Sequence, residues 1–125
     1  MRIGSLVIAA LLAATSAGAH HSNSAFNPDK VVVLKGTVTQ FKWVNPHVWI
    51  FLSVDDGKGG KEAWEIEGRP PGVLSRSGWS KTILKVGDTI TVDFSPARDG
   101  SRTGLTTRVT LADGTVLSNA PPAVQ

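Results

Sequence analysis

Three histidines are the residues of this chain best suited to metal chemistry. His20 and His21 are adjacent near the start of the chain, and His47 follows an Asn-Pro pair. Imidazole nitrogen is a ligand for copper, zinc, iron and nickel, and Cu(II) stands at the top of the divalent affinity order. The chain contains no Cys. A metal site in this protein would therefore use nitrogen and oxygen ligands.

His20 gains a second metal ligand if the chain is cleaved in front of it. Residues 1–19 have the form of a secretory signal peptide, with one positive charge, an apolar run and a final Ala-Gly-Ala. Cleavage after residue 19 gives His20 a free α-amine, which can chelate one ion together with its own imidazole. The sequence therefore predicts a periplasmic or secreted protein that binds Cu(II) through His20, with His21 or His47 as a further ligand.

Two alternatives to this site remain open. Cleavage two residues earlier would give a Gly-Ala-His start, whose amine, amide and imidazole nitrogens suit square-planar copper or nickel. In a metal-free reading, His20 and His21 merely begin a polar arm, and His47 caps the entry to a strand. For His20 to reach His47, the arm must fold back along the first strand, which the sequence permits but does not require.

The aromatic residues Trp49 and Phe51 suggest a different, metal-free function. They alternate with apolar residues between positions 47 and 55, so they lie on the strand face opposite the predicted core. An open aromatic face could bind a protein or a small ligand, which makes Trp49 and Phe51 candidate ligand-binding residues. The other reading is that the N-terminal arm, the helix or the first strand covers them, because large exposed apolar patches are rare.

The order of the predicted elements indicates an all-β fold. A parity switch in the apolar residues of the first strand is typical of a β-bulge. Three strands, a short helix, two strands and a final short strand are the element order of an OB-type barrel. We therefore predict a small OB-like five-stranded barrel with one short helix between strands three and four, although a β-sandwich is the alternative. The predicted strands span 31–44, 47–55, 63–67, 88–95, 105–111 and 115–117, and the helix runs from Pro70-Pro71 to Ser77.

The predicted organisation is a single domain between two ends. A signal peptide (1–19) precedes an extended N-terminal arm (20–30), an OB-like β-barrel domain (31–118) and a flexible tail (119–125). The apolar run of the signal peptide is shorter than the about 20 residues that span a membrane, so no span is expected after cleavage. The mature protein is expected to be a monomer.

Charge and motif content argue against two other functions. The chain has 13 basic and 10 acidic residues, a net charge of +3, and its arginines are dispersed, so nucleic acid is not an expected partner. No nucleophile motif is visible. Glu65 and Glu67 share a strand face and are expected to be solvated. The sequence therefore predicts a binding protein and not an enzyme.

Several short motifs across the chain resemble those of a family of small exported bacterial proteins known as a domain of unknown function. The resemblance implies export and a β-rich fold, and it carries no activity or site residues. The motifs include His20-His21-Ser22, Trp43-Val44-Asn45-Pro46-His47, Gly78-Trp79, Pro96-Ala97-Arg98-Asp99-Gly100 and Thr110-Leu111-Ala112-Asp113-Gly114.

Overall fold

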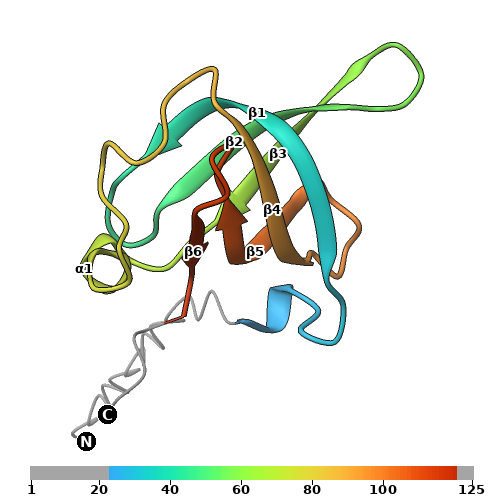
Figure 1. Cartoon of the computed structure of the whole chain (residues 1–125). Coiled ribbons are helices and arrows are strands. Elements are labelled where there is room, and N and C mark those ends of the chain that lie inside the picture. The colour runs from blue at the N-terminus through green and yellow to red at the C-terminus, as the bar shows by residue number, and fades with distance from the viewer. Residues whose placement is uncertain (1–22, 121–125) are drawn as a thin grey trace, which may run out of the picture.

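The computed structural model describes residues 23–120 and confirms the all-β, OB-like fold (Figure 1). Five strands form a closed barrel in the order β3-β2-β1-β4-β5, and a parallel pairing of β3 with β5 closes it. A sixth short strand extends the sheet beyond β5. The elements are η1 (Asn23–Ala25), β1 (Val32–Lys42), β2 (Trp49–Asp55), β3 (Lys61–Glu67), α1 (Pro71–Ser75), β4 (Thr89–Pro96), β5 (Thr103–Thr110) and β6 (Val116–Ser118).

The long first strand, β1, pairs with two neighbours, β4 and β2. Its N-terminal half pairs with β4 and its C-terminal half with β2. Gly36 lies in the middle, where a Cβ atom would come within 2.9 Å of the Ser53 carbonyl oxygen, so only glycine permits this approach. The register with β2 shifts between Val38 and Gln40. This shift is the bulge that the parity switch predicted.

The barrel interior is filled by the alternating apolar residues of the strands. Trp79 closes one end, where its indole Nε1 donates a hydrogen bond of 2.8 Å to the Ser118 carbonyl oxygen. Trp64 packs against Phe94 with ring centroids 5.5 Å apart. The buried hydrophobic residues are Val38, Val48, Ile50, Leu52, Val54, Ile66, Leu74, Trp79, Leu84, Ile90, Val92, Phe94, Val109 and Leu117.

Helix α1 is short and is defined by residues at both of its ends. Pro71 takes the first helical position, where a missing N–H costs nothing. Leu74 is fully buried and fixes the helix to the barrel. Gly78 has φ of +89°, which lets the chain turn away after the helix. The predicted helix between strands three and four is therefore confirmed, although it ends at Ser75.

The inward-facing parity of β5 changes part-way along the strand. Unbroken alternation would place Leu105 and Val109 on the same face. The pairing with β4 shifts by one residue at Thr107, so the strand changes parity there. Thr106 and Val109 are buried, whereas Leu105 lies on the outside of the barrel. A bulge without Gly or Pro leaves no clear signal in the sequence.

The C-terminal tail begins later than predicted. Asn119 is only 5% exposed, and its backbone N–H donates to the Thr107 carbonyl oxygen at 3.0 Å. The hydroxyl of Ser77 donates to the Ala120 carbonyl oxygen at 2.8 Å. Residues 119 and 120 therefore belong to the folded domain, and residues 121–125 lie outside the described part of the chain.

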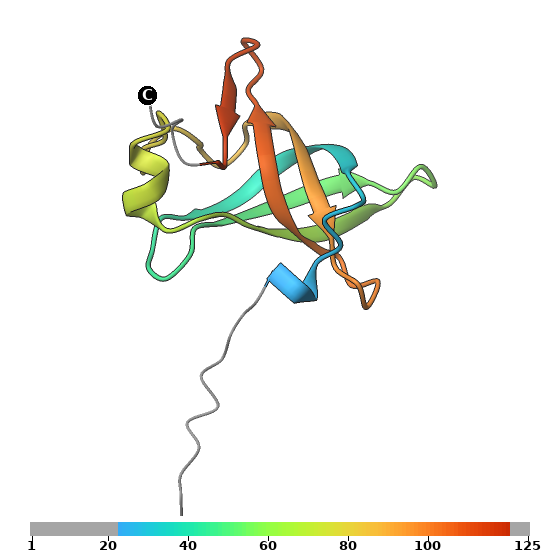
Figure 2. The same ribbon diagram turned by 90° about the horizontal axis from the view of Figure 1, so that it is seen from below.

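The described part of the N-terminal arm, residues 23–30, lies against the barrel (Figure 2). It forms the single turn η1 and then a β-bridge between Phe26 and Ala97, just after β4. The signal peptide predicted for 1–19, and both His20 and His21, lie outside the described residues. Between residues 23 and 120, no helix has the length and apolar character needed to span a bilayer.

The packing of β5 against Phe94 generates a stability prediction. A Cβ atom at Gly104 would lie 2.1 Å from the Phe94 ring, inside the closed barrel. We expect Gly104→Ala to lower the free energy of unfolding by about 1–3 kcal/mol, as overpacking of a filled core does. Urea unfolding followed by tryptophan fluorescence measures the change.

Gly72→Ala is the matched control. Gly72 lies in α1 with open space around the added methyl group. This substitution should leave stability unchanged or raise it by less than about 1 kcal/mol. Equal unfolding midpoints for the two variants would contradict the close contact of β5 with Phe94.

Candidate functional site

His47 lies at one end of the barrel, in the loop between β1 and β2. The loop contains a cis peptide between Asn45 and Pro46. The N–H of Gly68 donates to the Val48 carbonyl oxygen at 2.7 Å, so strand pairing continues one residue beyond β2. This pairing brings His47 beside the end of β3. Its Nδ1 atom lies 2.6 Å from an Oε1 atom of Glu67.

The partner of His47 is a residue that the sequence did not single out as functional. Glu67 was expected to be solvated like Glu65, and this expectation is wrong. The Glu67 side chain is only 12% exposed and that of His47 is 30% exposed, whereas Glu65 is exposed. The hairpin register of β2 and β3 could have indicated this contact. In that register Glu67 pairs directly with Trp49, two residues after His47.

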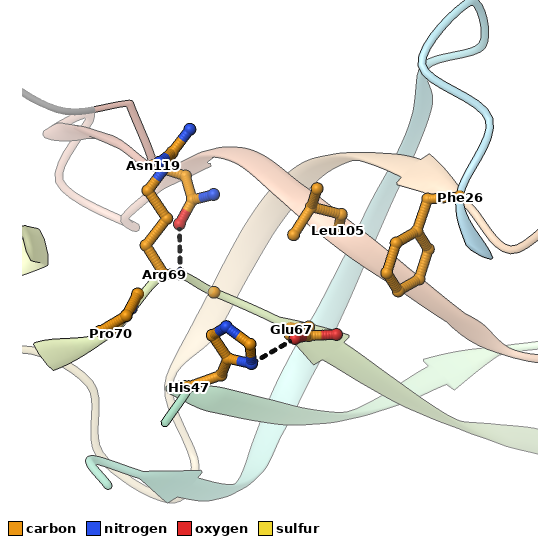
Figure 3. Close-up of a pocket in the computed structure, with 8 residues that line it drawn as sticks. Phe26, His47, Glu67, Arg69, Pro70, Leu105 and Asn119 are labelled. Carbon is orange, nitrogen blue, oxygen red and sulfur yellow. Dashed lines mark hydrogen bonds and ion pairs between the residues drawn. The ribbon is translucent and has the colours of Figure 1, made fainter. Parts of the chain in front are cut away.

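The contact with Glu67 fixes the chemistry of the imidazole ring. In the neutral ring, Nδ1 carries the proton that it donates to the carboxylate, so Nε2 keeps a free lone pair. Nε2 points away from Glu67 (Figure 3). Histidines that ligate metals almost always donate their other ring N–H to a carboxylate, a carbonyl or water. A histidine that ligates a metal through Nε2 would share this arrangement.

A small pocket of about 170 Å³ surrounds this pair. Its size matches a few water molecules at about 30 Å³ each and is below the roughly 300 Å³ at which pockets for larger ligands begin. The pocket suits an ion with part of its ligand set, or the end of a chain. Its lining residues are Phe26, His47, Glu67, Gly68, Arg69, Pro70, Leu105 and Asn119.

Five separate parts of the sequence line this pocket. Asn119 accepts a hydrogen bond of 2.9 Å from the Arg69 backbone N–H, which fixes the wall on one side. Leu105 and Phe26 lie on the other side (Figure 3). Leu105 reaches the outside because of the bulge in β5, and Phe26 comes from the N-terminal arm. Residue 26 of the arm therefore lies beside the pocket of His47.

Trp49 and Phe51 lie on the outer barrel face, as their alternation predicted, and both are half-buried. Trp49 lines a shallow groove together with Phe26, Glu65 and Arg102. Phe51 lies outside this groove, with the Lys42 ammonium 5.1 Å from its ring centroid. Of the two predicted ligand-binding residues on this face, Trp49 lines the groove and Phe51 does not.

Comparison with known proteins agrees with the motif resemblance. The family model described as a family of unknown function, DUF6152, matches residues 8–108. The chain belongs to this family. No curated protein matches it.

The fold is also found in a solved structure of distant sequence. The mitochondrial single-stranded DNA binding protein Rim1 from S. cerevisiae superposes with a TM-score of 0.52 at 9% identity. The match covers 66% of this chain and 93% of that chain. At this identity the likeness supports the OB-like fold alone.

The described residues supply only part of a metal site. Between residues 23 and 120 there is no cluster of three or more His, Cys, Asp or Glu side chains that could hold an ion. His47 is the single histidine in that range. The predicted ligands His20 and His21 lie outside it, so a complete site would need the N-terminal arm to provide the remaining donors.

The pairing with Glu67 predicts which ring nitrogen of His47 carries the proton. At a pH where the ring is neutral, we expect the Nδ1–H form in the wild type. Glu67→Met removes the acceptor and should shift His47 toward the Nε2–H form. Long-range ¹H–¹⁵N correlation spectra distinguish the two forms, and His47→Ala assigns the signals.

Glu65→Met is the control on the same strand face. Glu65 is exposed and is not a hydrogen-bond partner of His47, so this variant should keep the wild-type tautomer. A wild-type ring protonated at Nε2 would contradict the role given to Glu67.

Proposed function

We propose that the exported and processed protein binds one Cu(II) ion at the His47 end of the barrel. In this proposal, cleavage after residue 19 exposes the α-amine of His20, which chelates copper together with its own imidazole. Nε2 of His47 supplies a third nitrogen, with His21 as the other candidate for that position. The observation that carries the proposal is the His47–Glu67 pair, which leaves Nε2 free beside a pocket lined by the N-terminal arm.

The path of the arm supports this proposal. Phe26 lines the same pocket as His47. His20 precedes Phe26 by six residues, which span at most about 20 Å when extended. His20 is therefore within reach of His47 without any change in the barrel.

The ligand set favours copper over the other common metals. One amine and two imidazoles are nitrogen donors, which suit Cu(II), and the chain has no thiolate to favour zinc or Cu(I). Glu67 would fix the orientation of the His47 ring. We propose carriage or sensing of copper by a periplasmic monomer and not catalysis.

The alternative function is metal-free binding of a protein or small ligand beside Trp49. The observation that favours it is the groove in which Trp49 and Phe26 lie next to the charged groups of Glu65 and Arg102. OB folds commonly bind ligands on this face, including oligonucleotides. We do not propose nucleic acid here, because Glu65 and Glu67 place carboxylates on the face and would repel phosphates.

Copper binding is tested on protein exported to the periplasm, with the N-terminus first established by intact mass. We expect His20 as the first residue, one Cu(II) bound per chain more tightly than Zn(II), and nitrogen hyperfine structure in the electron paramagnetic resonance spectrum. The affinity should fall as pH falls, because the amine and the imidazoles must lose protons to bind.

Three variants test the assignment of ligands. A glycine inserted before His20 separates the amine from that imidazole and should change the spectrum. His47→Ala should remove one nitrogen, and Glu67→Gln should weaken binding by about 10- to 100-fold, as loss of a partner behind a metal ligand does. Trp49→Ala is the control and should leave copper affinity unchanged.

Two results would contradict the copper proposal. One is a mature protein that retains residues 1–19. The other is copper binding that survives the inserted glycine and replacement of all three histidines by alanine.

The metal-free alternative predicts instead that only Trp49→Ala abolishes ligand binding. Absence of binding to a fluorescent oligothymidine at low salt would agree with both proposals and contradict a DNA-binding role.

A further inference from the structure

Strand β3 is covered along only part of its second edge. β5 pairs with β3 from Glu65 to Glu67, and the N–H of Glu65 donates to the Arg102 carbonyl oxygen at 3.1 Å. β5 begins at Thr103, so its pairing stops there, while the β2–β3 hairpin continues and projects beyond the barrel (Figure 1). The N-terminal half of β3 therefore has β2 as its one strand neighbour among the described residues.

The backbone groups of Ala63 and Lys61 point to this uncovered side. The N–H of Gly68 donates to the Val48 carbonyl oxygen at 2.7 Å, and the register of β3 with β2 is unbroken from there to the hairpin loop. Every second residue of β3, counted from Gly68, therefore bonds to β2. Ala63 and Lys61 lie between those residues, so their N–H and C=O groups are directed away from β2, as the N–H of Glu65 is.

The hairpin that carries this edge is closed by its own side chain. An Oδ1 atom of Asp56 accepts hydrogen bonds from the backbone N–H groups of Lys58 at 2.6 Å and Gly60 at 3.0 Å. These bonds lower the pKa of the Asp56 carboxyl, so the carboxylate stays charged and holds the loop. The edge is therefore formed without a partner.

The groove of Trp49 runs beside the same edge. Its lining includes the aromatic rings of Trp49 and Phe26 and the small residues Ala63 and Gly100. It encloses about 870 Å³, which lies within the range of about 300–1,000 Å³ found for ligand sites. Ala63 is exposed, so a chain bound at the edge of β3 would also contact this groove.

The groove contains one carboxylate without a counter-charge. The guanidinium of Arg102 lies 3.4 Å from an Oε1 atom of Glu62. Glu65 is exposed, and its carboxylate takes part in none of the ion pairs between residues 23 and 120. The charge offered to a ligand is therefore negative. A lysine or arginine side chain would pair with Glu65 and could also lie over the ring of Trp49.

The spacing of the free backbone groups favours a peptide over other ligands. Ala63 and Lys61 present N–H and C=O groups at the repeat of alternate strand residues, about 7 Å. Another extended backbone has the same repeat and the complementary groups. A nucleic acid would instead bring phosphates against Glu65, and a sugar would match the repeat of neither donor nor acceptor.

We propose that the uncovered edge of β3 receives an extended peptide segment of a partner protein as an added strand. The backbone of the segment bonds to Ala63 and Lys61, and a lysine or arginine of the segment faces Glu65 and Trp49. Strand addition of this kind takes its affinity from main-chain hydrogen bonds and its specificity from alternate side chains. The inference rests on the metal-free alternative, whose partner class it names, and it is independent of copper.

The first measurement needs no ligand. In the free protein, the amide of Ala63 should exchange its hydrogen at least about 10-fold faster than that of Trp64, because the Trp64 N–H bonds to β2. Nuclear magnetic resonance resolves the two amides. Equal protection of both would mean that the edge is already covered in solution, and it would overturn the inference.

The second measurement uses a fluorescent peptide that alternates valine and lysine. We expect it to bind and to slow exchange at Ala63. Methylation of every second peptide nitrogen should abolish binding in one register and preserve it in the other, because only alternate N–H groups face β3. Absence of binding to the wild type would overturn the inference. Equal binding of both methylated peptides, with loss in Trp49→Ala, would overturn strand addition while the metal-free alternative stands.

Two pairs of variants test the residues on the protein side. Ala63→Pro removes the outward N–H, which takes no part in the ladder with β2, and should weaken peptide binding about 3- to 10-fold. Ala63→Thr keeps this N–H and is the matched control. Glu65→Gln should weaken binding about 2- to 5-fold, whereas Asp113→Asn, in the loop between β5 and β6, should not.

Urea unfolding midpoints show whether Ala63→Pro still folds. If it does not, the methylated peptides test the same hydrogen bonds on an unchanged protein. Equal peptide affinity in folded Ala63→Pro and Ala63→Thr would overturn the bond to Ala63. Equal effects of Glu65→Gln and Asp113→Asn would overturn the position given to the basic side chain.

Discussion

The barrel closes through three residue pairs between β3 and β5, and the candidate site depends on this closure. The pairing is parallel and joins strands that are far apart in the sequence. It sets Glu67 opposite Leu105, and both residues line the pocket of His47. It also sets Ile66 opposite Gly104, whose missing side chain admits the ring of Phe94. Without this pairing, β3 would be an edge strand with β2 as its one neighbour in the sheet.

The site itself combines a rigid sheet with two chain segments that lie outside it. The loop before β2 supplies His47, and the arm supplies Phe26. Strand pairing holds Glu67, so the imidazole is oriented by a carboxylate whose own position is fixed by the barrel. Groups held by regular elements keep their geometry better than groups on loops. In this site strand pairing fixes the Glu67 carboxylate, and the carboxylate in turn orients the His47 ring.

Sequence reasoning predicted the barrel, the helix and the bulge in β1. It could do so because apolar alternation and the turn-forming residues Gly, Pro and Asn are local signals. It predicted that Trp49 and Phe51 face outward for the same reason. It missed the bulge at Thr107 and the burial of Asn119, which depend on partners far along the chain. It also missed Glu67, because an alternating glutamate looks solvated until a loop covers it. Long-range contacts of this kind leave no periodic trace.

Phe26 is a wall shared by two cavities, since it lines both the pocket of His47 and the groove of Trp49. In the proposed functions, a ligand that moves this ring in the groove would change the pocket, and a metal that holds the arm in place would change the groove. Such coupling is reciprocal, because each ligand alters the affinity of the other by the same factor. The two proposed binding activities would therefore be linked through one aromatic side chain.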